Sequence, residues 1–526
     1  MRSGEIVETV SRGTFWLAVE KAAALMSGLV YFALLLRWLG PTKYGIMTLA
    51  LSFTGLATMA TGNFEMFLER YAAEYEARGL GGTLRRALLL ALQVKVGLGV
   101  LAGAALLAVT PAIARQFATP ELLVLIPVLV LTVAFDGVST TGRATLFGIQ
   151  RFRWLSVLAV IFHIAKTLMV GLLWWTRHGL LALAVGLVTL ALLQGVAQAV
   201  MPLWILRRAS DREPPSPERR WRGLLRSMLG YCLPLLGARV AFMSGQNLSK
   251  IILGRLFDIT LLGYFSFAYQ TIERFVEVAH TAPSALLPSL TRLETRGERA
   301  RLRLVFDQAL RLIQTLACVL SFGVFVFARE LTLLVGSPLF EPAIPLLRVL
   351  ALVPIARTAQ QPLTMLFQSL RRPGTVLALS TVKFVAEFGS YFLLVLPFGM
   401  IGAAWANLAG AVASYVAAMV VLRRLIPEGA GDRIRTGITA PALLLPFLGL
   451  TLLLDWSVRG PSQVVLHCAL VLPAGVSLFL ADLVRREDLD KLAGVTLARP
   501  WARLVRAGAL TVLGFFARLA APMRPS

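Results

Sequence analysis

Residues 179–226 contain the stretch that decides the fold. Residues 179–206 read GLLALAVGLVTLALLQGVAQAVMPLWIL, and residues 207–226 continue directly with RRASDREPPSPERRWRGLLR. A run of roughly 20 apolar residues is long enough to cross the hydrocarbon core of a bilayer as a helix. A basic segment directly after such a run is typical of the cytoplasmic end of a membrane span. This stretch therefore indicates a transmembrane helix followed by a cytoplasmic linker.

Apolar runs of the same kind recur along most of the 526 residues. Hydrophobic residues make up 57% and charged residues 15% of the sequence, whereas soluble domains carry about 25% charged residues. We predict an all-α polytopic membrane protein with about 14 transmembrane helices. The predicted spans are 15–36, 44–64, 87–109, 121–140, 154–175, 179–206, 228–254, 259–290, 309–328, 343–369, 374–397, 399–422, 437–454 and 463–481.

The positions of the basic residues predict the orientation. A formal net charge of +24 would favour a nucleic-acid partner in a soluble protein. Here the basic residues occupy every second gap, with about 35 inside and about seven outside when the N-terminus is placed in the cytoplasm. The outside residues are Arg37, Lys43, Arg115, Arg177, Arg255, Arg329 and Arg459. We expect an even number of spans, cytoplasmic N- and C-termini, a phospholipid bilayer as surroundings and no nucleic-acid partner.

The linker divides the sequence into two similar blocks. We predict a six-helix N-terminal lobe (1–206), the basic linker (207–227), a six-helix C-terminal lobe (228–425), two additional helices (426–484) and a cytoplasmic or interfacial amphipathic tail (485–526). RWLGPTKYG at 37–45 lies 218 residues before RLFDITLLG at 255–263. A repeat in the same orientation indicates two lobes related by an axis normal to the membrane.

Several motifs carry a resemblance to a known family. The pattern R-x-L-G-P-x-x-Y-G occupies residues 37–45, L-x-R-Y-x-A-E-Y occupies 68–75, and GAAWANLAGAVASY occupies 402–415. With these motifs the chain resembles bacterial polysaccharide-biosynthesis membrane proteins, the lipid-linked oligosaccharide flippases of the MOP superfamily. Fourteen spans are more similar to the lipid II flippase branch, whereas many members, such as Wzx-like proteins, have twelve.

This resemblance implies a V-shaped transporter in the cytoplasmic membrane of a bacterium or archaeon. Such a protein would move a polyprenyl-diphosphate-linked oligosaccharide or cell-envelope precursor from the inner to the outer leaflet by alternating access. The lipid-linked saccharide would be its substrate, and polysaccharide-assembly membrane proteins would be its candidate partners.

Basic residues inside the predicted spans are the candidates for binding a diphosphate. A charge at bilayer depth is costly, so it indicates a partner or an aqueous cavity. Arginine offers phosphate a two-pronged fork, and lysine offers it a point charge. The candidate substrate-binding cations are Arg239, Arg274, Arg357, Lys166, Lys95 and Lys250. Lys250 can also lie near a span end with its ammonium group at the interface.

Further charged residues are candidates for coupling or gating: Glu273, Glu277, Glu387, Lys383, Glu20 and Lys21. The acids could take Na+ or H+, although their spacing is not diagnostic of either ion. Lys383 and Glu387 are four residues apart, which is also the spacing of a structural ion pair within a helix. Glu273 and Glu277 can instead simply neutralise Arg274.

The sequence offers no sign of a cofactor or of soluble enzyme chemistry. It contains no G-x-x-x-x-G-K-[ST] motif for ATP and no H-E-x-x-H or G-x-S-x-G motif. Cys232, Cys318 and Cys468 have no zinc-binding spacing. We therefore expect no catalytic residues, no metal and no cofactor.

Two other functions remain open. A multidrug or organic-cation antiporter of the same superfamily would also have two six-helix halves, but it favours acidic, aromatic pockets. A membrane-embedded polysaccharide polymerase or glycosyltransferase would favour a long outer loop with paired carboxylates. The outer gaps here are all short, so this enzyme is the least favoured of the three.

Overall fold

The computed structural model describes residues 3–210, 221–281, 290, 293–294, 296–370, 372–457 and 461–480. Helices dominate these residues, and no β-strand occurs among them. The chain divides into two compact units, Met1–Ser266 with Leu334–Phe340, and Phe267–Leu333 with Glu341–Ser526. The lobe boundaries drawn from the sequence stay predictions. The predicted tail at 485–526 and most of the linker lie outside the described residues.

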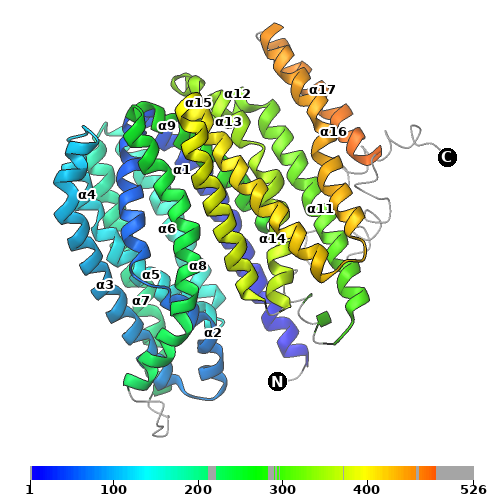
Figure 1. Ribbon diagram of the computed structural model, residues 1–526. Helices are drawn as coiled ribbons and strands as arrows, with labels where there is room; N and C mark the ends of the chain where they lie inside the picture. The colour runs from blue at the N-terminus through cyan, green and yellow to red at the C-terminus, as the bar shows by residue number, and fades with distance from the viewer. Residues whose placement is uncertain are drawn as a thin grey trace. The chain divides into compact units, whose positions relative to one another are not determined.

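The first unit contains the helices of the N-terminal half (Figure 1). They are α1 (Ser3–Met59), α2 (Phe64–Ala77), α3 (Gly81–Gln116), α4 (Leu122–Leu129), α5 (Leu131–Gly148), α6 (Phe152–Trp175), α7 (Leu180–Ser210), α8 (Trp221–Leu256) and the start of α9 (Ile259–Thr281). Helix α5 packs against α2, α3 and α7, while α1 packs against α6 and α8. Phe67, Leu84 and Leu146 are fully buried in the core that α2, α3 and α5 share.

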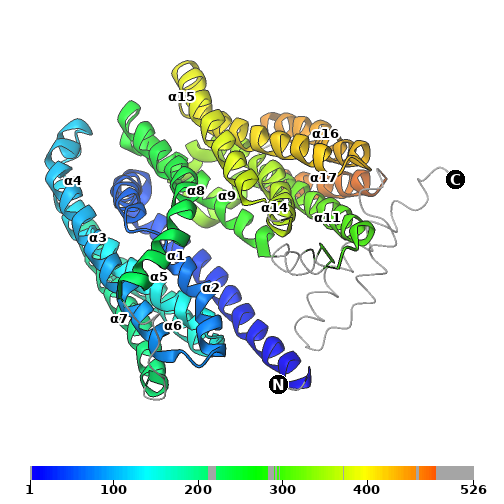
Figure 2. The ribbon, with the colours of Figure 1, turned by 60° about the horizontal axis from the view of Figure 1, so that its bottom comes forward.

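The second unit contains the rest of α9 and the helices that follow it. The α-helices are α11 (Arg299–Val326), α12 (Ala328–Leu331), α13 (Ile344–Leu350), α14 (Val353–Ser369), α15 (Pro373–Leu425), α16 (Ala430–Ser457) and α17 (Pro461–Leu480). Between α12 and α13 lie the π-helical turn η3 (Thr332–Gly336) and the 3-10 turn η4 (Pro338–Ala343), and each of these turns is divided between the two units. Phe306, Leu363 and Leu422 are buried between α11, α14 and α15. Helices α16 and α17 lie side by side (Figures 1 and 2), and Leu444 and Ala474 pack with Phe322 of α11.

The protein is a multi-pass membrane protein, but its spans are not evenly separated helices. Eight described helices are long and apolar enough to cross a membrane, or nine if the bent pair α13–α14 counts as one span. The difference from 14 arises partly because α1 and α15 each join two predicted spans into one element. The number 14 therefore stays a prediction, whereas the all-α membrane fold is confirmed.

Each of these two long helices is broken at a glycine. In α1, Gly40 has φ +65° and precedes Pro41; in α15, Gly399 has φ +58° and follows Pro397 closely. Only glycine adopts such a φ without steric cost, and proline is compatible with the first turn of a new helix. Each element is therefore two helices that meet with almost no loop.

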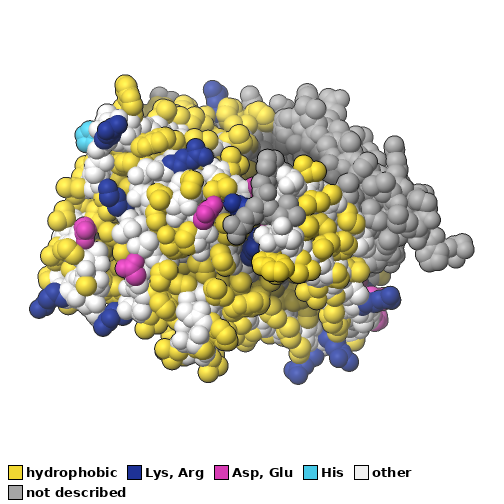
Figure 3. All heavy atoms as spheres, turned by 90° about the horizontal axis from the view of Figure 1, so that it is seen from above, with side chains coloured by type: hydrophobic (Ala, Val, Ile, Leu, Met, Phe, Trp, Pro, Cys, Tyr) yellow, Lys and Arg dark blue, Asp and Glu magenta, His cyan; other side chains and the backbone are white. Residues whose placement is uncertain are grey.

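Many large hydrophobic side chains are exposed on the described helices, as is expected of a surface in contact with lipid. Figure 3 shows hydrophobic side chains over much of the face in view, with only scattered basic and acidic groups. Leu101, Leu168 and Leu396 are 68%, 67% and 80% exposed, an unusual position for leucine in water. Trp175 and Trp456 are exposed at the ends of α6 and α16, as interfacial tryptophans are expected to be.

Candidate functional site

The segment 37–45 forms the break of α1, and each of its characteristic residues has a structural task. The Arg37 guanidinium donates a hydrogen bond to the Leu334 carbonyl at 2.6 Å. Gly40 supplies the left-handed backbone, and Pro41 begins the second part of the helix. Tyr44 is buried against Phe340, with ring centroids 6.4 Å apart. The motif therefore fixes the geometry of the kink and is not itself a cluster of ligand-binding groups.

The kink of α1 contacts the start of α9, which is its counterpart in the repeat. The hydroxyls of Thr42 and Thr260 are hydrogen-bonded at 3.0 Å. A Cβ on Gly45 would lie 2.1 Å from the Ile259 carbonyl oxygen, and a Cβ on Gly263 would lie 2.0 Å from the Pro41 carbonyl oxygen. The offset of 218 relates Thr42 to Thr260, Gly45 to Gly263 and Pro41 to Ile259. It therefore converts the Gly45–Ile259 contact into the Gly263–Pro41 contact, and the arrangement is the same from either side. This symmetry supports the internal repeat that the sequence indicates.

Asp258 stabilises the start of α9 at this contact. Its carboxylate accepts a hydrogen bond from the Thr260 backbone N–H at 2.9 Å. Hydrogen bonds from the Thr260 side chain and backbone lower the pKa of Asp258 from its ordinary value. Asp258 therefore stays ionised as the cap of α9.

In the second unit, the structure brings four of the predicted site residues together between α9, α14 and α15. Glu273 of α9 forms an ion pair and hydrogen bond with Arg357 of α14. The Tyr269 hydroxyl also hydrogen bonds Glu273, and Lys383 lies close enough to interact electrostatically with it. Lys383 in turn pairs with Glu387 at 2.9 Å. We call Tyr269, Glu273, Arg357, Lys383, Glu387 and Asn407 the α9–α14–α15 cluster.

Asn407 closes this cluster from the second part of α15. Its amide Nδ2 donates to Glu387 Oε1 at 2.8 Å, across the break at Gly399. The two parts of α15 approach so closely that only glycine fits at two positions. A Cβ on Gly402 would lie 2.0 Å from the Leu394 carbonyl oxygen, and one on Gly410 would lie 2.6 Å from the Glu387 Cβ. The small residues of segment 402–415 thus allow the contact that holds Glu387.

In the first unit, two further ion pairs join helices to one another. Lys95 of α3 is 1% exposed; its ammonium lies 2.5 Å from Glu65 of α2 and donates to the Thr140 hydroxyl of α5 at 3.2 Å. Glu20 of α1 pairs with Arg143 of α5 at 2.5 Å. Each pair joins two different helices, and therefore stabilises this unit as long as both partners are present.

The remaining predicted residues have other environments. Lys166 lies over the Tyr31 ring, 4.7 Å from its centroid, while Lys21 is exposed. Lys250 is buried at 8% exposure in α8. Arg274 is half-buried and 3.5 Å from Glu277, which is exposed. Arg239 belongs to α8, but its side chain lies outside the described residues.

These contacts change the electrostatic character expected of the site. The sequence suggests a lining of cations, whereas Lys95, Arg274, Arg357 and Lys383 each lie beside a carboxylate. A paired guanidinium or ammonium is not an open charge, so an anionic ligand must compete with that carboxylate. Among the described residues, no group of three or more His, Cys, Asp or Glu side chains is placed to hold a metal ion.

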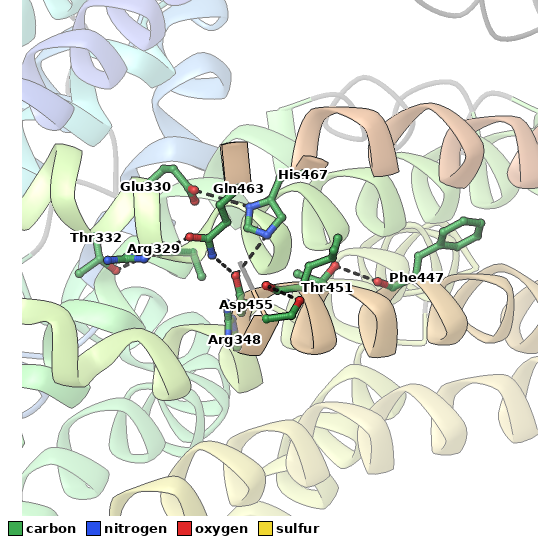
Figure 4. A network of polar contacts seen from close by, with 12 residues as sticks. Arg329, Glu330, Thr332, Arg348, Phe447, Thr451, Asp455, Gln463 and His467 are labelled. Atoms are coloured by element: carbon green, nitrogen blue, oxygen red, sulfur yellow. Dashed lines mark hydrogen bonds and ion pairs between the residues drawn. The ribbon is translucent and has the colours of Figure 1, made fainter. Parts of the chain in front are cut away.

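Sequence reasoning did not identify a second polar network, which lies in α12, α13, α16 and α17 (Figure 4). His467 is fully buried, with Nδ1 3.5 Å from Glu330 and Nε2 3.2 Å from Asp455. Asp455 also pairs with Arg348, and Gln463 bridges Asp455 to Arg329. The sequence did contain a signal for this network, because Asp455 and His467 each lie within an apolar helix, α16 and α17. It attaches the C-terminal helix pair to the rest of the unit.

Replacing His467 with alanine should destabilise this attachment. The substitution leaves Glu330 and Asp455 without the imidazole between them, and a buried polar group that loses its partner costs about 1–3 kcal/mol. We expect a lower melting temperature of the detergent-purified full-length protein. The matched control is His178→Ala, because His178 is exposed and contacts the Thr176 hydroxyl next to it in sequence. Equal melting of both variants and the wild type would contradict the role given to His467.

A sequence profile of the family described as polysaccharide biosynthesis protein matches residues 34–345, which include the α1 kink and its contact with α9. The chain belongs to this family. No curated protein matches the sequence.

Solved structures show which fold this polysaccharide biosynthesis protein has. One is the lipid II flippase MurJ in an inward closed conformation, with a TM-score of 0.62 and 13% identity, over 89% of this chain and 99% of that one. Another is an inward-facing multidrug resistance MATE family transporter of the MOP superfamily, with a TM-score of 0.59 and 15% identity, over 80% of this chain and 99% of that one. An outward-facing structure of such a transporter gives 0.54 and 16% identity, over 80% and 95%. The protein therefore has the fold of MOP-superfamily transporters.

Proposed function

We propose that the protein is a flippase that moves a polyprenyl-diphosphate-linked oligosaccharide or cell-envelope precursor from the inner to the outer leaflet. The observation that carries this proposal is the coincidence of two similarities. The sequence belongs to a polysaccharide biosynthesis family over residues 34–345, and the fold is that of a lipid II flippase over 89% of the chain. The three structural relatives described above are all transporters, so we favour transport over an enzymatic reaction.

In this proposal, charged groups inside the helices bind the polar part of the substrate. A diphosphate and a sugar cannot cross hydrocarbon bare, since each unsatisfied polar group costs several kcal/mol, roughly 2–7. The α9–α14–α15 cluster offers Arg357 and Lys383, both already held by carboxylates. A diphosphate that displaces Glu273 or Glu387 would favour whichever conformation allows that exchange, which is what alternating access needs. The released carboxylate is then free to bind H+ or Na+, so either ion could be coupled to transport in this proposal.

The test measures the lipid-linked saccharide itself. In cells depleted of the protein, we expect a polyprenyl-diphosphate saccharide to accumulate with its sugar on the cytoplasmic side, identified by mass spectrometry and by protection from an added glycosidase. Purified protein in liposomes should then make the same lipid accessible from the opposite leaflet. Unchanged lipid pools, together with no flipping in liposomes, would refute the proposal.

Arg274→Ala should lower transport strongly while leaving the protein folded. Arg274 is half-buried, and its carboxylate neighbour Glu277 is 3.5 Å away and exposed, so its guanidinium is loosely held. We expect at least about a tenfold loss of flipping, the effect of losing one charge-assisted phosphate contact. Arg274→Lys keeps the charge but loses the two-pronged fork, so it should fall between alanine and wild type. Full transport by Arg274→Ala would remove this residue from the substrate site.

A multidrug exporter remains the second candidate, because the MATE transporters share the fold over 80% of the chain. An exporter of this kind would protect cells against organic cations. Drug susceptibility of the depleted cells separates the two functions: hypersensitivity with normal lipid-linked saccharides favours export of drugs, and the reverse favours the flippase.

A further inference from the structure

A cavity of about 880 Å³ lies in the second unit, apart from the charged clusters described above. It is bounded by the beginning of α11 and by the ends of α14 and α15. The basic residues that line it are Arg299, Arg303, Arg311 and Arg372, and the acidic ones are Glu294, Asp307 and Glu428. The distribution of arginines in the sequence assigns this end of the helices to the cytoplasm.

Two of the three carboxylates that line this arginine cavity are engaged by arginines of the protein itself. Arg433, which is 5% exposed, holds Asp307 with two hydrogen bonds: its Nε lies 2.6 Å and its Nη2 3.2 Å from the two carboxylate oxygens. The same guanidinium donates to the Ile426 carbonyl at 2.9 Å, which fixes the wall between α15 and α16. Arg303 pairs with Glu428. Asp307 and Glu428 therefore have little negative charge left to offer the cavity.

The result is a positive cavity. Among the described residues, five arginines including Arg433 lie beside three carboxylates, an excess of two positive charges. The first residues of α11 also line the cavity, so the positive end of that helix dipole adds to the same field. An anion with more than one negative oxygen is the complementary ligand, and the guanidinium fork suits phosphate.

Apart from Gln308, the remaining lining is apolar and continues onto the outer surface. Leu370, Leu425 and Ile426 line the cavity together with Leu304, which is 57% exposed on α11. A leucine exposed on a membrane-spanning helix contacts acyl chains. Phosphate-binding cations beside a lipid-facing apolar wall match a molecule that carries a phosphate headgroup on a hydrocarbon tail.

We propose that this arginine cavity binds the phosphate headgroup of a membrane lipid with net negative charge in the cytoplasmic leaflet. The chemistry is shared by anionic phospholipids and by polyprenyl diphosphates, and binding of either kind requires the same cations. The inference does not depend on the proposed transport, because binding is measured without any translocation.

The test uses the full-length protein in phosphatidylcholine nanodiscs. Phosphatidylglycerol or a polyprenyl diphosphate is added, and bound lipid is counted by native mass spectrometry, with inorganic diphosphate as a water-soluble competitor. We expect the double variant Arg299→Ala/Arg372→Ala to bind the phosphate lipid at least about tenfold more weakly. The matched control is Arg301→Ala, because Arg301 is on the same helix but 78% exposed, pairs with Glu298 at 2.8 Å and does not line the cavity.

Each outcome decides the proposal. Preferential binding of phosphatidylglycerol that the double variant loses identifies a phospholipid site, and preferential binding of the polyprenyl diphosphate identifies a site for the carrier lipid. Equal binding of phosphatidylcholine and of the two anionic lipids overturns the proposal. An equal loss in Arg301→Ala also overturns it, because the effect would then belong to the general surface charge. Wild-type binding by the double variant does so as well.

Discussion

Gly45→Ala should unfold or inactivate the protein, although it adds a single methyl group. The new Cβ would lie 2.1 Å from the Ile259 carbonyl oxygen, and the obstacle is backbone, which cannot move aside as a side chain does. The start of α9 must therefore separate from the α1 kink. Forcing extra atoms into a packed contact costs about 1–3 kcal/mol, and more where the backbone is rigid. We expect a clear fall in melting temperature and loss of flipping.

The repeat supplies a second variant with the same expected effect. Gly263→Ala places a Cβ 2.0 Å from the Pro41 carbonyl oxygen, on the opposite side of the same contact. The double variant should lose less stability than the sum of the two single losses, because one substitution already separates the helices. Strictly additive losses would show that the two glycines act at independent places.

Gly97→Ala and Gly449→Ala are the matched controls. Both glycines are helical, and nothing lies within 4 Å of a Cβ built on either. Alanine in an open helical position is favourable by up to about 1 kcal/mol relative to glycine, so these variants should melt at or above the wild-type temperature. If Gly45→Ala behaves as they do, the close approach of α1 and α9 is not a feature of the protein in the membrane.

This contact also shows what the sequence could and could not predict. The offset of 218 indicates that segments 37–45 and 255–263 are equivalent, and the structure agrees. Equivalence in sequence says nothing of distance, so the touching of the two segments could not be foreseen. Similarly, hydropathy finds apolar runs but does not show that Gly40 and Pro41 join two of them with almost no loop.

The charged residues give a similar lesson. Burial within apolar runs was enough to nominate Glu273, Arg357, Lys95 and Glu20, because a charge at that depth is always conspicuous. Local spacing also indicated the pair of Lys383 with Glu387. The partners Glu65, Arg143 and Asn407 could not be assigned, because they come from other helices or from across a break. Without those partners, the sequence did not show that a buried cation such as Lys95 lies beside a carboxylate.

The Glu273–Arg357 ion pair at the centre of the α9–α14–α15 cluster should stabilise the protein and also take part in transport. Single variants of the pair test its role in stability, and the double variant tests its role in transport. Arg357→Gln leaves Glu273 without its ion pair, with the Arg357 and Glu273 side chains only 14% and 23% exposed in the wild type. Breaking a buried pair costs about 3–5 kcal/mol, because the remaining charge is uncompensated. We expect Arg357→Gln to melt far below the wild type, and Glu273→Gln to do the same.

The double variant Glu273→Gln/Arg357→Gln separates the structural role of the pair from its proposed role in binding. Two neutral amides leave neither charge of this pair uncompensated, so most of the lost melting temperature should return. Transport should not return, because the cluster has lost the guanidinium of Arg357 that is proposed to receive the diphosphate. The exposed pair Glu74–Arg78, with side chains 42% and 58% exposed, is the control: the same double replacement there should change stability by less than about 1 kcal/mol and leave transport intact. Transport at the wild-type rate by Glu273→Gln/Arg357→Gln would show that Arg357 only neutralises Glu273, and the substrate would then have to be bound by other cations.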